Sequence, residues 1–227
     1  MSYAVVTGAG RGIGEATVHA FAARGIDVAL LGHHRDPLLT VAQAARRKGV
    51  KAEVFQCDVR SSKDVHASAH ASLGAWGAPA CVVNNAGVIR RAAVHELSEE
   101  DWECTLDTNL KGVFLVTRAF LASMLAVKRG RIVTVSSISA TLGTPGSSAY
   151  CASKWGVVGF MKSLAEELRH TGLQAISVLP GSVDTAMLDG SGFSPQMTPN
   201  DVAKLIVYAA LDAPDAMNGS AVELFGP

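Results

Sequence analysis

The chain has 227 residues, of which 48% are hydrophobic, and its 20 basic residues balance its 20 acidic ones. This length and apolar content suffice for one large α/β domain with a sizeable core. A zero net charge without a basic stripe argues against a nucleic-acid or membrane-surface partner. Uninterrupted apolar runs, such as 28–31, are short and fall far below the ~18 residues that a membrane span needs.

Short runs rich in β-branched residues alternate along the chain with longer segments of helical spacing. Strands are expected near residues 3–7, 27–31, 51–57, 80–84, 130–136, 173–179 and 220–225. Helices are expected near residues 12–24, 37–48, 61–74, 98–127, 149–170 and 198–212. This alternation implies βαβ units. The sequence therefore predicts a single Rossmann-type, doubly wound α/β domain over residues 1–227, with a mainly parallel seven-stranded sheet and helices on both faces.

A glycine-rich stretch, TGAGRGIG at 7–14, lies between the first expected strand and the first expected helix. Glycines there let the backbone approach a pyrophosphate, and the helix N-terminus supplies N–H groups and a partial positive charge. A glycine-rich turn without a ligand is the simpler alternative, but the strand–turn–helix context favours dinucleotide binding. The spacing of Gly8, Gly12 and Gly14 differs from the common G-x-G-x-x-G.

Tyr150 and Lys154 are four residues apart in an expected helix, with Ser137 upstream. This spacing places the phenol and the ammonium on one helix face. A fixed positive charge lowers the pKa of a neighbouring phenol, whose ordinary value is ~10, so the pair is a candidate acid/base site. The spacing alone is common on helix surfaces, and only its combination with the other motifs makes it specific.

Taken in order, these motifs resemble those of the short-chain dehydrogenase/reductase family over essentially the whole chain. Residues 7–14 resemble the family's T-G-x-x-x-G-x-G loop, residues 84–87 its N-N-A-G turn, and residues 180–185 its P-G-x-x-x-T segment. The four residues Asn109, Ser137, Tyr150 and Lys154 resemble its catalytic tetrad. Among its members, the chain looks most like 3-oxoacyl-acyl-carrier-protein reductases.

The resemblance implies an enzyme that reduces a ketone to a secondary alcohol, or the reverse, with a nicotinamide cofactor. Tyr150 would exchange the proton, Ser137 would position the substrate oxygen, and Lys154 would lower the pKa of the tyrosine and hold the ribose. Asn109 would kink its helix and hold a water. The alternative is a non-catalytic dinucleotide-binding sensor or regulatory subunit, whose expected sign is a broken tetrad.

The resemblance also implies which residues hold the cofactor. These are Gly8, Gly10, Arg11, Gly12, Ile13, Gly14, His33, Asp58, Val59, Asn85, Ala86, Gly87, Tyr150, Lys154, Pro180, Gly181, Val183 and Thr185.

The choice of cofactor depends on the residues after the second expected strand. The family's acidic position falls on Gly32, so no carboxylate is there to repel a 2′-phosphate. The stretch His33-His34-Arg35 and Arg11 offer cations instead, which favours NADP(H). NAD(H) stays open because Arg11 also occurs in relatives that use it. Since histidine titrates near ~6.5, NADPH affinity should weaken from pH 6 to 8 more than NADH affinity.

Substrate and partners are the least specified part. Residues 186–198 are expected to form a substrate lid, with Gly190 and Gly192 as hinges over an apolar carbonyl or alcohol substrate. Arg90 and Arg91 could attract an anionic substrate or be solvated surface charge. An acyl carrier protein is a candidate partner through the basic side chains at Lys128, Arg129 and Arg131. Family members form homodimers or homotetramers through the helices expected at 98–127 and 149–170.

Cysteine and histidine positions give little sign of a metal. The cysteines, Cys57, Cys81, Cys104 and Cys151, lack metal-type spacing. His66 and His70 share a helix face, but without a third ligand a polar surface is the simpler interpretation. The chain begins almost directly with a strand pattern, which leaves no room for a signal peptide. We therefore expect free thiols, a cytoplasmic protein and no metal.

Overall fold

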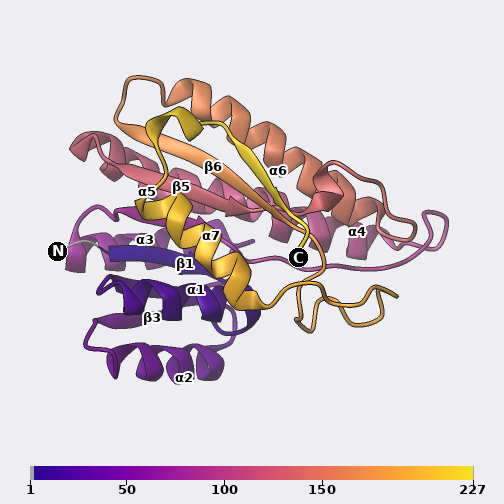
Figure 1. The fold of residues 1–227 in the computed structure, drawn as a ribbon, viewed down its shortest axis with the longest axis horizontal. Helices are drawn as coiled ribbons and strands as arrows, with labels where there is room; N and C mark the ends of the chain where they lie inside the picture. Colours follow the sequence, from indigo (N-terminus) through magenta and orange to yellow (C-terminus); the bar gives the residue numbers. More distant parts are fainter. Residues whose placement is uncertain (1–2, 227) are drawn as a thin grey trace.

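The computed structural model describes residues 3–226. Within them, seven strands form one parallel sheet in the order β3-β2-β1-β4-β5-β6-β7 (Figure 1). The strands are β1 (Tyr3–Thr7), β2 (Asp27–Gly32), β3 (Ala52–Gln56), β4 (Cys81–Asn84), β5 (Gly130–Val135), β6 (Leu173–Pro180) and β7 (Ala221–Leu224). The helices are α1 (Gly12–Ala23), α2 (Arg35–Arg46), α3 (Ser62–Trp76), α4 (Glu99–Leu106), α5 (Gly112–Val127), α6 (Ser148–Glu167) and α7 (Pro199–Leu211), with 3₁₀ turns at Ile138–Ala140 and Asp215–Met217. The predicted doubly wound α/β fold is confirmed.

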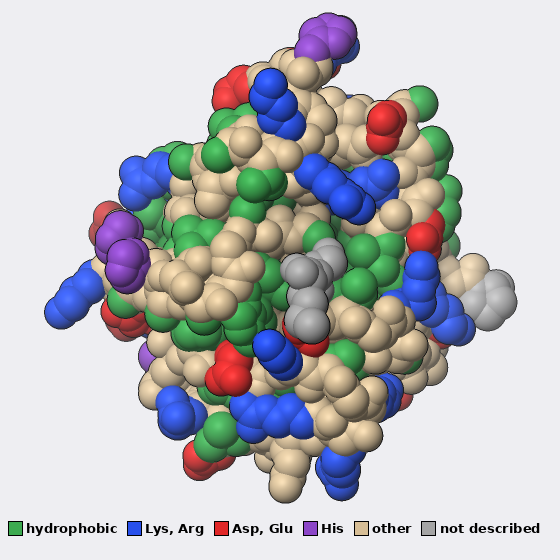
Figure 2. Space-filling model, turned by 90° about the vertical axis from the view of Figure 1, so that its left-hand side faces the viewer, with side chains coloured by type: hydrophobic (Ala, Val, Ile, Leu, Met, Phe, Trp, Pro, Cys, Tyr) green, Lys and Arg blue, Asp and Glu red, His purple; other side chains and the backbone are tan. Residues whose placement is uncertain are grey.

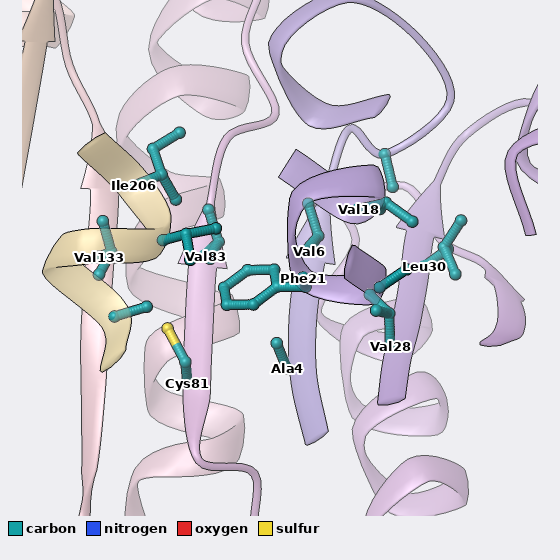
Figure 3. Close-up of a cluster of buried hydrophobic side chains, with 14 of the residues drawn as sticks. Ala4, Val6, Val18, Phe21, Val28, Leu30, Cys81, Val83, Val133 and Ile206 are labelled. Atoms are coloured by element: carbon teal, nitrogen blue, oxygen red, sulfur yellow. The ribbon is translucent and has the colours of Figure 1, made fainter. Parts of the chain in front are cut away.

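Successive side chains along each strand point to opposite faces of the sheet, and they form a hydrophobic core on each face. On β1, Ala4 and Val6 belong to the core under α1, α2 and α7, whereas Tyr3 and Val5 belong to the core under α3, α5 and α6. Figure 3 shows the first core, where the ring of Phe21 from α1 lies over the sheet. Both faces are therefore covered, as a parallel sheet requires.

The strand order creates a switch point between β1 and β4. β1 pairs with β2 on one side and with β4 on the other. The chain that leaves β1 enters α1 on one face of the sheet, whereas the chain that leaves β4 leads to α5 on the opposite face. In doubly wound sheets, ligands bind in the crevice that this divergence opens at the carboxyl ends of the strands. The long connections after β4 and β6 project from this same edge, at the right of Figure 1.

The helix predicted over 98–127 is interrupted by a π-helical turn. α4 and α5 are joined by Asp107–Lys111, which has π geometry and contains Asn109. A π turn inserts an extra residue into the helix and often marks a functional position. The kink that the resemblance implies at Asn109 is therefore a π-helical turn.

The same stretch is the most apolar helix of the chain. Glu99–Val127 is 29 residues long with a mean hydropathy of 1.7 in its most apolar window, so by length and composition it could cross a membrane. The core helix of a soluble protein passes the same test, and α5 supplies Val116, Phe120 and Met124 to the core beneath the sheet. Only 39% of the window is buried, because the opposite face of the helix is exposed. We interpret α5 as a core helix with an apolar outer face.

Gly14 permits a close approach that tests the geometry of the glycine turn. A Cβ at Gly14 would lie 2.1 Å from the carbonyl oxygen of Gly8. We expect Gly14→Ala to lower the free energy of unfolding by about 1–3 kcal/mol, because the turn must open to accept the methyl group. Urea denaturation followed by circular dichroism measures this change.

Gly74 in α3 is the matched control. A Cβ there meets nothing within 4 Å, so Gly74→Ala should be neutral or stabilise the helix by about 0.5–1 kcal/mol. A Gly14→Ala protein as stable as wild type would mean that the turn is not packed as described.

Candidate active site

Two neighbouring strand ends are clasped together at the switch point. The Thr7 hydroxyl accepts hydrogen bonds from the backbone N–H groups of Asn85 (2.9 Å) and Ala86 (3.0 Å). In return, the Asn85 side-chain amide donates to the carbonyl oxygens of Thr7 (3.0 Å) and Gly8 (3.3 Å). The side chain of Asn85 therefore holds the glycine turn in shape from behind.

The N-terminus of α1 faces the space beyond this turn. Arg11 precedes the helix and makes no side-chain capping bond, so the first backbone N–H groups remain available to a phosphate. Gly12 has a φ of +57°, and a Cβ on it would lie 3.3 Å from Cγ2 of Thr185. Segments 7–14 and 180–185 thus border one shared space, the cofactor cradle. A side chain at Gly12 would occupy part of this space. This arrangement fits a dinucleotide pyrophosphate.

The other predicted cofactor residues near this cradle are partly structural. Ile13 packs against one core and Val59 is buried in the other. Pro180 ends β6, and the Gly181 N–H donates to the carbonyl of Leu224 on β7 (2.8 Å). These residues fix the walls of the crevice more than they line its open space.

At the other end of the crevice, three predicted residues follow the carboxyl ends of β1, β2 and β3, namely Gly10, His33 and Asp58. The Asp58 carboxylate is held by Arg60, with 2.7 Å between Nη2 and Oδ2, and hydrogen bonds from Arg60 keep the pKa of Asp58 below its usual range. Nδ1 of His33 lies 3.9 Å from the same carboxylate. A Cβ on Gly10 would lie 3.0 Å from Cβ of Pro37 in the first turn of α2. The glycine turn, His33 and Asp58 therefore meet around one region suited to an adenosine.

Asn109 joins the loop after β4 to helix α6. Its Oδ1 accepts from the Val88 N–H (2.8 Å), and its Nδ2 donates to the Val88 carbonyl (2.9 Å) and to Oγ of Ser153 (3.0 Å). Because the residue is 1% exposed, these bonds are shielded from water. Asn109 thereby fixes the position of α6, which carries Tyr150 and Lys154, relative to the cofactor cradle.

Ser137 follows β5 and presents its hydroxyl toward the crevice edge. Its Oγ accepts a hydrogen bond from the Ser139 N–H (3.1 Å) at the start of a 3₁₀ turn. With the oxygen engaged as an acceptor, the O–H proton is left to donate. Ser137 is therefore set up as a donor to an oxygen beside Tyr150.

Tyr150 and Lys154 lie on one face of α6, as their spacing predicts. Tyr150 is 8% exposed and Lys154 is 4% exposed. The Lys154 amine lies 5.5 Å from the centroid of the Tyr150 ring and donates to the Val135 carbonyl (2.9 Å). A Cβ on Gly87 would lie 3.7 Å from Nζ of Lys154. The structure thus brings the end of the N-N-A-G turn next to α6, which carries Tyr150 and Lys154.

Burial is the largest influence on the ionisation of Tyr150 and Lys154, and the effect of Lys154 on the Tyr150 phenol stays a prediction. Burial raises the pKa of Tyr150 above 10, while a hydrogen bond with Ser137 and the charge of Arg91 act in the opposite direction and the Cys151 thiol adds to the rise. Burial also lowers the pKa of Lys154 to about 8. Desolvation outweighs charge pairing because both groups are enclosed. The phenol is therefore protonated at neutral pH.

Three residues that matter here escaped the sequence analysis as site residues. They are Thr7, whose hydroxyl holds the Asn85 backbone, Ser153, which bonds Asn109, and Arg91, which reaches the lid. Thr7 is the first residue of the glycine-rich motif, Ser153 adjoins Lys154, and the sequence predicts Arg91 only as a charge for an anionic substrate or for the solvent. Their contacts join segments that are far apart in the sequence.

The basic residues proposed to dock a carrier protein do not lie beside the chain's own catalytic residues. Lys128 and Arg129 precede β5, at the edge of the sheet opposite Ser137. Arg131 is 16% exposed, and its guanidinium donates to the carbonyls of Ala209 (3.0 Å) and Ala213 at the end of α7. Figure 2 shows the amino-end face, where basic side chains are scattered among acidic and apolar ones. Docking of a carrier protein through Lys128, Arg129 and Arg131 stays a prediction.

The two neighbouring histidines of α3 lie side by side without a third ligand among the described residues. The rings of His66 and His70 stack with centroids 6.3 Å apart. Within residues 3–226, no group of three or more His, Cys, Asp or Glu side chains could hold a metal ion. The expectation of a metal-free protein stays a prediction.

Comparison with known proteins agrees with this site. The model of the short chain dehydrogenase family matches residues 2–192, so the chain belongs to this family. It is accordingly an NAD(P)-dependent oxidoreductase that acts on CH–OH or ketone groups.

Individual relatives cover nearly the whole chain. A 3-oxoacyl-(acyl-carrier-protein) reductase of Synechocystis sp. is 34% identical over 220 residues, covering 92% of this chain and 89% of the relative. The reductase of the same description from Thermotoga maritima is 30% identical over 234 residues, covering 98% and 95%. The crystal structure of a short-chain type dehydrogenase/reductase from Mycobacterium marinum has a TM-score of 0.94 at 30% identity, covering 99% and 94%.

The buried amine of Lys154 predicts a specific pH dependence of stability. Below pH 8 the amine is protonated in the folded and unfolded states, and its burial opposes folding by on the order of 3 kcal/mol, from a pKa of about 8 against 10.5. Between pH 8 and 10.5 the folded state has released a proton that the unfolded chain still binds, so folding becomes more favourable. Lys154→Met should therefore be more stable than wild type at pH 7, with an advantage that shrinks across this window.

Urea denaturation of the cofactor-free proteins at several pH values measures the difference. Other ionisations cancel in the comparison, and the lost bond to Val135 contributes a constant offset. A stability difference that does not vary between pH 7 and 10.5 would contradict the assigned pKa.

Proposed function

We propose that this protein is an NADPH-dependent reductase that converts the 3-oxo group of an acyl thioester, carried on an acyl carrier protein, to a secondary alcohol. The observation that carries the proposal is the protonated, buried phenol of Tyr150 beside the Ser137 hydroxyl. A neutral phenol can give its proton to a substrate carbonyl oxygen as negative charge develops on that oxygen. The names of the Synechocystis and Thermotoga relatives support the substrate class.

The chain's own groups account for binding, orientation and proton transfer. A bound nicotinamide cofactor supplies the hydride. Ser137 donates a hydrogen bond to the substrate carbonyl oxygen and holds it beside Tyr150. The phenol then gives its proton to that oxygen as negative charge develops there. The Lys154 ammonium, which is close to Gly87 and the Tyr150 ring and stays protonated at pH 7 with a pKa of about 8, would stabilise the resulting phenolate and would bind the ribose hydroxyls of the cofactor.

The preference for NADPH is supported by the surroundings of Gly32. A Cβ there would lie 3.2 Å from a methyl group of Leu38, so the position is closely packed, and as glycine it presents no carboxylate to repel a 2′-phosphate. Three nearby residues, Arg11, His33 and Arg35, are exposed and can contact a 2′-phosphate. Asp58 also lies near His33, and its charge opposes phosphate binding to some extent. NAD(H) remains the second candidate.

Nothing in the site favours the non-catalytic sensor. That reading expects a broken tetrad, whereas Asn109, Ser137, Tyr150 and Lys154 are all present and buried at one edge of the sheet.

We also propose that the chain forms a homodimer or homotetramer in the cytoplasm. Large apolar side chains lie exposed on the outer faces of α4, α5 and α6, including Trp102 (38%), Phe114 (41%) and Trp155 (55%). Such surfaces are typical of interfaces. All four cysteines lie within the described residues and are free thiols, which suits a reducing compartment.

The central test replaces the proton donor. Tyr150→Phe should lower kcat for NADPH-dependent reduction of a 3-oxoacyl thioester by about 10²–10⁴-fold, because general acid catalysis is lost. NADPH oxidation at 340 nm measures turnover on the carrier-protein thioester, a short thioester mimic and a bulky aryl ketone.

Tyr208→Phe is the matched control, because Tyr208 lies on α7 and is 41% exposed. Cofactor binding, followed by NADPH fluorescence, should survive both substitutions. Equal turnover by wild type and Tyr150→Phe would rule out the proposed role, and no turnover by wild type on any substrate would favour the sensor.

The cofactor preference has a separate test. Arg11→Gln should weaken NADPH binding by about tenfold while changing NADH binding little, since only NADPH carries the 2′-phosphate that this cation can contact. Arg46→Gln, at the far end of α2, is the control. Equal losses for both cofactors would assign Arg11 to the shared pyrophosphate instead. Fluorescence titration from pH 6 to 8 also reports whether His33 favours NADPH at low pH.

A further inference from the structure

The lid is anchored at its base and held at its tip by few contacts. At the base, Val183 pairs with Met197, and the Asp184 N–H donates to the Met197 carbonyl (2.9 Å). Toward the tip, Gly190 and Gly192 adopt positive φ, and a Cβ on either would meet nothing within 4 Å. The tip is therefore free to move unless other parts of the chain restrain it.

The side chain of Arg91 restrains the backbone of this tip by hydrogen bonding to it. Arg91, in the loop after β4, donates from Nη2 to the Met187 carbonyl (2.9 Å) and from Nη1 to the Asp189 carbonyl (3.0 Å). The planar guanidinium spans two alternate carbonyls at once, which the single ammonium of a lysine does not reproduce. Within residues 3–226, three hydrogen bonds link residues 186–193 to segments far from them in the sequence. Two come from Arg91 and the third comes from Tyr150.

In this position of the lid, the Met187 side chain contacts the hydroxyl group of Tyr150. The Tyr150 hydroxyl donates to Sδ of Met187 at 4.0 Å. A substrate carbonyl oxygen must occupy the space next to the same hydroxyl, so Met187 has to leave when substrate enters. The lid in this structure is closed onto the catalytic acid.

We propose that Arg91 latches residues 187–189 over Tyr150 in the substrate-free protein and, through this contact, brings a positive charge toward the phenol; it is a positioning residue and not a catalytic one. This inference rests on the proposed reductase function for its catalytic consequence, but the latch itself does not. Arg91 acts through the lid and through its charge, and it takes no proton.

The charge of Arg91 bears on the proton affinity of Tyr150. The groups that face the phenol are the Ser137 hydroxyl from the end of β5, the Cys151 thiol and Lys154 from α6, and Arg91 from the β4 loop. Burial raises the pKa of Tyr150; the hydrogen bond with Ser137 opposes this rise, and the charge of Arg91 opposes it to a smaller extent.

Neighbouring Arg90 provides a matched control. Its guanidinium pairs with Asp101 on α4, with 3.1 Å between Nε and Oδ1. It is exposed like Arg91 and carries the same charge, but none of its hydrogen bonds reaches the lid. Arg90→Gln should thus leave the lid and Tyr150 unchanged, whereas Arg91→Gln should alter both.

The first test measures the latch without turnover. Hydrogen–deuterium exchange of the cofactor-free protein should show amides in residues 186–193 exchanging about tenfold faster in Arg91→Gln than in wild type, because the closed lid loses both bonds. Arg91→Lys should fall between the two, and Arg90→Gln should match wild type. Equal exchange in Arg91→Gln and wild type would overturn the latch.

The second test measures the charge during turnover. In the direction of alcohol oxidation, kcat/KM rises with pH as Tyr150 ionises, and Arg91→Gln should move this rise to higher pH. Arg91→Lys keeps the charge and should move it less, which separates charge from lid geometry. An unmoved profile in Arg91→Gln would overturn the electrostatic part. Absence of turnover in wild type would count against the proposed function, while the exchange result would still decide the latch.

Discussion

The carboxamide of Asn109 is the contact on which the geometry of the site depends. It is buried in a π-helical turn and bonds the Val88 backbone on one side and Ser153 of α6 on the other. The first contact fixes the loop that carries Gly87, and the second fixes the helix that carries Tyr150 and Lys154. A single polar side chain thereby sets the distance between the cofactor cradle and the proton donor.

Burial of this edge determines the chemistry of the groups that it holds. Enclosure raises the proton affinity of the Tyr150 phenol and lowers that of the Lys154 amine, so each group is biased toward its neutral form. A neutral phenol at pH 7 is a proton donor, which is the role that ketone reduction requires. The same enclosure explains why the short spacing between the two residues does not by itself produce a phenolate.

Much of this could be predicted from the sequence because it depends on local pattern. All seven strands and the helix order followed from β-branched runs and helical spacing, and the tetrad followed from the resemblance of Asn109, Ser137, Tyr150 and Lys154 to a family motif. The direction in which the pKa of Tyr150 shifts could not be predicted, because the shift depends on how closely distant segments enclose the ring. The Thr7–Asn85 clasp and the Arg91–lid contacts join residues far apart in the chain, and the side chain of Arg131 turns toward α7 for a reason that only the fold shows.

The most direct test of the account is the ionisation of Tyr150 in the cofactor-free protein. Ultraviolet difference titration of wild type against Tyr150→Phe isolates this phenol from Tyr3 and Tyr208. The account predicts that the pKa of Tyr150 lies above the ordinary value of 10, so the group is a protonated donor at neutral pH. A pKa below 10 would contradict it and would restore charge stabilisation by Lys154 as the dominant effect.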